Sequence, residues 1–152
     1  MAHCISGKTT TLIAACALGL ACIAPLGASA AEPAVAAEVS SIQQAVQQGA
    51  EIFANNRFGG AATCETCHVN GGRTAGKLPN GKEIPSLAGA AAAFPRFLAK
   101  RQTVVTLSQQ IARCIAGGVQ GTPPAFGSPE MVDLETYITS LSKGAVMGQQ
   151  FN

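Results

Sequence analysis

The chain has few aromatic and few charged residues. Tryptophan is absent from the 152 residues, tyrosine occurs once, and aromatic residues make up 5%. Charged residues make up 12% and the formal net charge is +2, which excludes the strongly basic surfaces that bind nucleic acid. A domain of this size with so few aromatic side chains has a thin core, and a tightly held apolar group would supply the missing volume.

The first thirty residues have the pattern of an export signal. Lys8 is their only charge, residues 12–26 form an apolar run, and Ala28-Ser29-Ala30 is a small-residue cleavage site. We therefore predict a signal peptide over residues 1–30 and a periplasmic mature protein. An uncleaved N-terminal anchor is the alternative, but the run is shorter than the ~20 apolar residues of a membrane span. We expect no stable membrane span after cleavage.

Cleavage after Ala30 would remove three of the six cysteines and one of the two histidines. The mature chain would keep Cys64, Cys67 and Cys114, and His68 as its single histidine. Three cysteines leave one without a disulfide partner within the chain, in a compartment that oxidises thiols.

The segment Cys64-Glu65-Thr66-Cys67-His68 is a C-x-x-C-H motif, the attachment pattern of c-type haem. Positions three and four apart share one face of a helical turn. Cys64 and Cys67 can therefore both form thioethers with one porphyrin edge, and His68 can present an imidazole nitrogen to the iron. The alternative is a redox-active or zinc-binding C-x-x-C that a histidine happens to follow. We predict one covalent haem c with His68 as the proximal ligand.

The periodicity of apolar residues predicts a helix over residues 38–56, with Gly49 at a place where another helix crosses closely. Residues 69–92 and 117–127 are rich in glycine and proline and are expected to be loops. A short helix, interrupted or started at Pro95, is expected over residues 90–101. Thr106 and Gln109 form a capping box for a helix to about Ala116, and Ser128-Pro129-Glu130 starts a helix to about Lys143. No strand pattern and no repeat is apparent.

This order of helices and loops resembles the class I cytochrome c fold. Gly49 and Phe53 match the glycine and aromatic pair of that family's first helix, and Tyr137 matches the aromatic residue of its last helix. The resemblance implies an all-α domain of about four to five helices around one haem, over residues 38–144. A flexible lead-in over residues 31–37 and a tail over residues 145–152 flank it. Residues 84–89 resemble the family's G-P-x-L-x-G stretch, which implies that the carbonyl of Pro85 accepts a hydrogen bond from His68.

The second half of the chain resembles thiosulfate dehydrogenases and related sulfur-oxidation cytochromes. The similar segments are residues 94–97, 105–107, 111–114, 128–131 and 137–138. The resemblance implies that Cys114 is the second axial ligand of the haem. The family's arginine four residues before this cysteine is Gln110 here, which puts substrate binding in doubt. On a helix, the side chain of Arg113 would point more than a quarter-turn away from Cys114. Arg96 and Arg101 could substitute for the family's arginine, but we interpret them as solvated surface charges.

The residues leave the sixth haem ligand open. The place of the usual methionine, before a proline in the last loop, is taken by Thr122. Cys114 is the first candidate and Met131, inside the last helix, is the second. An open site or a lysine are the remaining alternatives. A thiolate should lower the reduction potential, whereas methionine should raise it.

These observations favour a periplasmic mono-haem carrier of single electrons that serves sulfur-compound oxidation, with a redox partner protein such as another cytochrome. One haem motif and no second catalytic constellation favour a carrier over an enzyme. The first alternative is an enzyme, or enzyme subunit, that oxidises thiosulfate at Cys114. The second is a high-spin cytochrome that binds gas.

Overall fold

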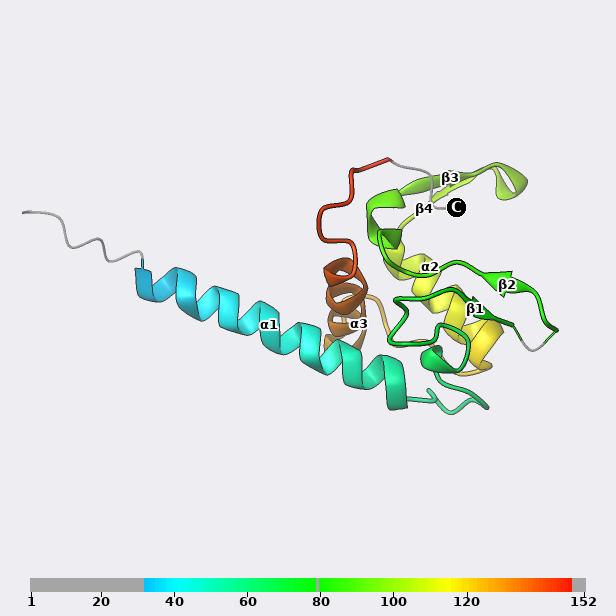
Figure 1. Ribbon diagram of the computed structural model, residues 1–152, viewed down its shortest axis with the longest axis horizontal. Helices are drawn as coiled ribbons and strands as arrows, with labels where there is room; N and C mark the ends of the chain where they lie inside the picture. The colour runs from blue at the N-terminus through cyan, green and yellow to red at the C-terminus, as the bar shows by residue number, and fades with distance from the viewer. Residues whose placement is uncertain (1–31, 79, 149–152) are drawn as a thin grey trace, which may run out of the picture. The chain divides into compact units, whose positions relative to one another are not determined.

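The computed structural model describes residues 32–78 and 80–148. The expected signal peptide lies outside these residues. Within them, the helices are α1, α2 and α3, the short helical turns are η1 to η4, and the strands form two pairs (Figure 1). The elements in chain order are α1 (Glu32–Asn55), η1 (Cys64–Thr66), β1 (Gly76–Lys77), β2 (Glu83–Ile84), η2 (Ala90–Ala93), β3 (Arg96–Leu98), η3 (Ala99–Arg101), β4 (Thr103–Val105), α2 (Leu107–Cys114), η4 (Ile115–Val119) and α3 (Pro129–Ser140).

Helix α1 begins at Glu32, so residues 32–37, expected to be a flexible lead-in, are helical instead. The composition explains the difference, because this segment is rich in alanine and proline is tolerated in a first helical turn. No helix in residues 32–78 and 80–148 is long and apolar enough to cross a membrane.

Helices α1 and α3 cross each other (Figure 1), and Gly49 lies at their close approach, as expected from the sequence. A Cβ atom at Gly49 would overlap the carbonyl oxygen of Asp133 and lie 2.7 Å from Cβ of Tyr137. The rings of Phe53 and Tyr137 pack next to this crossing with their centroids 5.4 Å apart. The core spreads from here to α2 and η4, and its buried members are Phe53, Ile111, Ile115, Met131, Leu134, Tyr137 and Ile138.

The two helix starts that the sequence predicted are confirmed. The hydroxyl of Thr106 accepts a hydrogen bond from the backbone N–H of Gln109, whose side chain accepts one from the N–H of Thr106. Ser128 caps α3 through the N–H of Met131, with Pro129 at the first helical position. The caps satisfy N–H groups that would otherwise lack partners.

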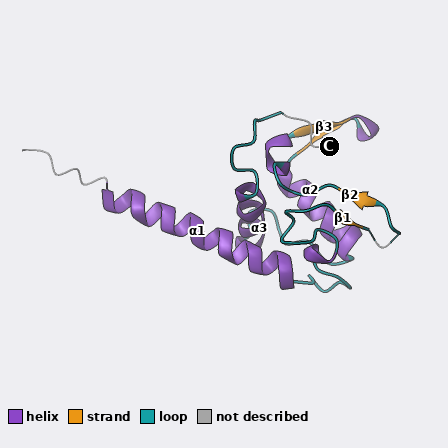
Figure 2. Cartoon of the chain, in the orientation of Figure 1, coloured by secondary structure: helices purple, strands orange, loops and turns teal. Residues whose placement is uncertain are grey.

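The expected helix over residues 90–101 is not formed. Pro95 interrupts it, because the residue before a proline is driven to an extended conformation, as Phe94 shows with φ −112° and ψ 150°. The segment consists instead of η2, β3 and η3, and β3 pairs with β4 in an antiparallel hairpin (Figure 2).

The expected all-α architecture therefore needs correction. A second antiparallel pair, β1 with β2, joins Gly76 to Ile84. These strands are two or three residues long, too short for an alternating pattern to show in a sequence. The described residues contain three α-helices rather than four to five. Residues 145–148 of the expected tail contain neither helix nor strand.

The end of α2 continues directly into η4, a single π-helical turn that contains Gly117 and Gly118. Two backbone hydrogen bonds join this region to the segment before the haem motif. Ala61 donates to the carbonyl of Val119 over 3.0 Å, and Thr122 donates to the carbonyl of Phe58 over 2.8 Å. We call this pair of bonds the backbone clamp. A side chain at Gly121 would overlap Phe58, so the clamp depends on a glycine there.

Candidate haem site

The haem motif begins with one short helical turn. Thr63 and Thr66 cap it through the bond from the N–H of Thr63 to Oγ1 of Thr66, 3.1 Å long. The N–H of His68 then donates to the carbonyl of Cys64 over 3.0 Å, the spacing of an α-helical turn. Cys64 and His68 line one cavity together. Cys67 does not line it, and its carbonyl instead packs against Gly76, where a Cβ atom would overlap it.

The walls of this cavity come from two groups of elements. We call Cys64 and His68 the motif side, and the four α2 residues Leu107, Gln110, Ile111 and Cys114 the α2 side. Cys114, which the resemblance implied to be the second axial ligand, thus lines the same cavity as Cys64 and His68. The rest of the lining is apolar and consists of Phe53, Leu87, Ala90, Phe94, Leu134 and Ile138.

His68 presents an unusual buried group. Its Nδ1 atom is buried and has no hydrogen-bond partner, which buried polar atoms seldom lack. Burial also lowers the pKa of the imidazole, which favours the neutral ring that binds metals. The hydrogen bond expected between His68 and the carbonyl of Pro85 is not formed, and Pro85 is exposed. Its role remains a prediction for the haem-bound protein.

The Cys64 thiol is shifted by its surroundings in the cavity. Burial, and next the charge of Cys114, raise the pKa of the Cys64 thiol to about 12. The Cys64 thiol is therefore protonated at neutral pH. Cys114 is exposed, and none of the three cysteines in the described residues forms a disulfide.

These residues fit the haem that the motif implies. An apolar lining suits a porphyrin, the imidazole of His68 lines the cavity and can offer a nitrogen to iron, and the thiol of Cys64 is available for a thioether. The cavity volume, about 80 Å³, is below the ~300–1,000 Å³ of ordinary ligand pockets.

Met131, the second candidate ligand, does not reach the cavity. Its side chain is fully buried in the core, and it is absent from the cavity lining. Its place on the apolar stripe of α3, three residues before Leu134, explains why it packs inward. The structure thus brings Cys114, and not Met131, to the haem motif.

The arginines differ in their relation to the site. Arg101 is exposed at the surface. Arg96 is also exposed, but its guanidinium lies 4.7 Å from the ring centroid of Phe94, a residue of the cavity lining. Arg113 was expected to point away from Cys114. Its guanidinium instead donates to Oε1 of Gln110 over 3.4 Å, and Nε2 of Gln110 donates to Sγ of Cys114 over 3.3 Å.

Sequence reasoning missed this link, because it considered the direction of Arg113 and not its length. Residues three and four apart on a helix are neighbours, and a long side chain covers that distance. The spacing of Gln110, Arg113 and Cys114 was the signal that could have shown it.

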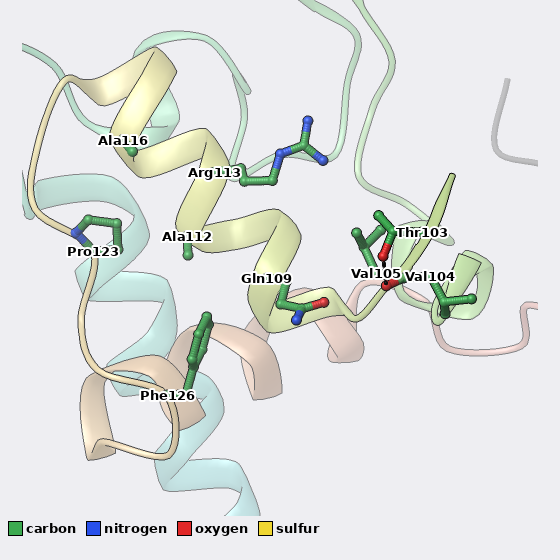
Figure 3. A pocket seen from close by; sticks show the side chains of 9 residues that line it. All are labelled: Thr103, Val104, Val105, Gln109, Ala112, Arg113, Ala116, Pro123 and Phe126. Atoms are coloured by element: carbon green, nitrogen blue, oxygen red, sulfur yellow. Dashed lines mark hydrogen bonds between the residues drawn. The ribbon is translucent and has the colours of Figure 1, made fainter. Parts of the chain in front are cut away.

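A second cavity lies on the other side of α2. Figure 3 shows Gln109, Ala112 and Ala116 along this helix, beside Pro123 and Phe126 of the following loop. The lining is mostly apolar, and Phe126 is 65% exposed. Arg113 also lines this groove, with its side chain directed away from Pro123 and Phe126 (Figure 3). Helix α2 therefore separates the haem cavity from an open groove. Arg113 lines the groove and is joined to the haem cavity through its hydrogen bond to Gln110.

Comparison with known proteins agrees with this site. The family described as SoxA/TsdA, cytochrome c domain, matches residues 48–147. The chain belongs to this family, so it has the cytochrome c fold and haem c is the cofactor that the family implies. The match covers the haem motif, α2 and α3.

Individual relatives are thiosulfate dehydrogenases. That of Thiomonas intermedia (strain K12) is 28% identical over 166 aligned positions, which cover 90% of this chain and 51% of the relative. That of Stutzerimonas stutzeri (strain A1501) is 32% identical over 111 positions, 69% of this chain and 34% of the relative. The chain is thus a c-type cytochrome that resembles thiosulfate dehydrogenases, and it spans about half or less of their length.

A solved structure shows the same likeness. The thiosulfate dehydrogenase (TsdBA) from Marichromatium purpuratum superposes with a TM-score of 0.56 at 26% identity. The superposition covers 71% of this chain and 24% of that one.

Proposed function

We propose that this chain is a periplasmic mono-haem cytochrome c that carries single electrons in the oxidation of sulfur compounds. Cys64 and Cys67 would hold the haem through thioethers, and His68 and Cys114 would be its axial ligands. The observation that carries the proposal is the shared cavity of Cys64, His68 and Cys114. Haem supplies the one-electron chemistry, and the chain sets the potential and the access to it.

The distribution of the residues around the cavity supports a carrier. Cys64 of the motif side packs against the core, and the apolar lining would exclude water from a bound haem. The sulfur of Cys114 lies at the exposed end of the site, where electrons could pass to a partner protein. A second cytochrome is the partner class that we propose.

The ligand set can be tested by electron paramagnetic resonance with near-infrared magnetic circular dichroism on the ferric, haem-loaded protein. We expect a low-spin His/thiolate signature that disappears in Cys114→Ala and persists in Met131→Leu. An unchanged signature in Cys114→Ala would remove Cys114 from the proposal. A high-spin signature in the unmodified protein would instead favour the gas-binding alternative.

The carrier role can be tested by voltammetry and by mass measurement of the exported protein. We expect a reversible one-electron wave, one haem per chain and a mature sequence that begins after Ala30. An irreversible wave would contradict the carrier. Two haems per chain, or retention of residues 1–30, would contradict the corresponding parts of the proposal.

A second candidate is an enzyme, or enzyme subunit, that oxidises thiosulfate. The names of the relatives and the exposure of Cys114 favour it. Oxidation of two thiosulfate anions to one tetrathionate releases two electrons, which a redox partner has to accept. Reduction of the haem by thiosulfate, lost in Cys114→Ala, would establish this activity. No reduction of the unmodified protein by thiosulfate would exclude it.

A further inference from the structure

Three side chains at the end of α2 form a hydrogen-bonded chain. Arg113 Nη1 donates to Gln110 Oε1 over 3.4 Å, and Gln110 Nε2 donates to Cys114 Sγ over 3.3 Å. An arginine can only donate, so the amide oxygen of Gln110 has to face the guanidinium. That orientation leaves the amide N–H₂ group for the sulfur. Arg113 therefore fixes the orientation of the Gln110 amide, so that its N–H₂ group and not its oxygen faces the sulfur of Cys114.

We propose that Gln110 is a positioning residue for the sulfur of Cys114, and that Arg113 holds Gln110 in place. This inference rests on the proposed ligation of the haem by Cys114. A hydrogen bond to a ligand sulfur withdraws electron density from the metal and raises its reduction potential. Gln110 thus offsets part of the lowering that a thiolate causes.

The location of the chain of bonds supports this role. Gln110 lines the haem cavity with Cys64 and His68, whereas Arg113 lines the open groove on the other side of α2 (Figure 3). The neutral amide of Gln110 therefore stands between the guanidinium charge of Arg113 and the sulfur of Cys114, and the amide makes the contact with the sulfur. A neutral donor stabilises the sulfur less than a charged one would.

We predict that substitutions at residue 110 can either lower or raise the reduction potential of the haem. Gln110→Leu removes the donor and should lower the potential. Gln110→Arg places a charged donor next to the sulfur and should raise the potential above that of the unmodified protein. Arg113→Gln frees the amide to rotate, so it should lower the potential by less than Gln110→Leu does.

The experiment measures the potential of the haem-loaded variants by voltammetry, with the ferric spectrum as a second readout. We expect Gln110→Leu to change the equilibrium constant for reduction about tenfold, which is about 59 mV for one electron. The matched controls are Gln48→Leu on the exposed face of α1 and Arg101→Gln at the surface, and both should leave the potential unchanged.

A double-mutant cycle separates positioning from a general electrostatic effect. In the Cys114→Ala background, the effect of Gln110→Leu should vanish. An equal shift in both backgrounds, or no shift in either, would overturn the inference. If Cys114→Ala leaves the ferric spectrum unchanged, the proposed ligation fails first and the inference falls with it. If Cys114→Ala changes the spectrum while Gln110→Leu has no effect, only the inference fails.

Discussion

The two sides of the haem cavity are built differently. On the motif side, His68 lies 6.4 Å from Phe53, between ring centroids, and Phe53 is part of the closely packed crossing of α1 and α3. On the α2 side, Cys114 is exposed and directly precedes a π-helical turn with two glycines. The motif side packs against the core at Phe53, and on the α2 side Leu107 and Ile111 also pack in the core, whereas Gln110 and Cys114 are joined by a polar contact. We therefore expect the motif side to determine which cofactor is held, and the polar contacts of the α2 side to tune its reduction potential.

The largest expected effect comes from changing the ligand on the α2 side. Cys114→Met should raise the reduction potential by on the order of 0.1–0.4 V, within the ~0.8 V range that axial ligands span. The reason is that a thioether donates less charge to iron than a thiolate does. Voltammetry gives the potential, and guanidinium unfolding should show little loss of stability, because the side chain is exposed.

An unchanged reduction potential in Cys114→Met would contradict the assignment of the potential to the α2 side. Cys114→Ala serves as the control, since it removes the sulfur without offering another ligand.

The next effect is on stability, and it concerns the crossing of α1 and α3, next to which the motif side packs. Gly49→Ala should lower the free energy of unfolding by about 1–3 kcal/mol, because its Cβ would collide with the backbone of Asp133. This loss should exceed the gain of up to ~1 kcal/mol in helix propensity. Guanidinium unfolding of the haem-loaded protein measures it.

Gly117→Ala in η4 is the matched control, because nothing lies within 4 Å of the added Cβ atom. Equal stability of the two alanine variants would show that the crossing of α1 and α3 is not as tight as described.

A smaller effect is expected where the last helix meets the loop after the motif. Tyr137 donates from its hydroxyl to the carbonyl of Gly71 over 2.8 Å and accepts from Arg73 over 3.3 Å. Tyr137→Phe keeps the ring in contact with Phe53 and should cost about 0.5–1.5 kcal/mol. Unfolding curves give this value, and an unchanged potential would agree with a structural role. Arg73→Gln, which keeps the bond to Gly71, should cost less.

The smallest effect concerns the start of α2. Thr106→Ala removes the cap of this helix and should cost about 0.5–1 kcal/mol. Hydrogen exchange of the α2 amides, compared with those of α3, localises the loss. Exchange that accelerates equally in both helices would mean that the α2 side is as strongly coupled to the core as the motif side.

Short-range sequence patterns predicted much of this structure. The haem motif, the capping box at Thr106, the cap at Ser128 and the close crossing at Gly49 each depend on a few neighbouring residues or on one steric requirement. The placement of Cys114 at the site was predicted from a resemblance, and the shared cavity agrees with it.

Other features depend on contacts that such patterns do not contain. The two strand pairs are held by partners up to nine residues away and are too short to show a periodicity. The link from Arg113 to Cys114 needs the length and orientation of an intervening amide. Met131 lies on the apolar stripe of α3, but the elements that cover this stripe are set by the packing of α3 on α1, which the sequence does not display.

The backbone clamp has a consequence for chain length. It ties Ala61, three residues before the haem motif, to Val119, five residues after Cys114. Two short chain segments, from Ala61 to His68 and from Val119 back to Cys114, thus connect the imidazole and the sulfur to the backbone clamp. Adding a residue between Cys114 and Val119 would move the sulfur by one helical step while every residue type stayed the same. The number of residues in η4 therefore helps to set where Cys114, the proposed ligand, lies relative to the haem motif.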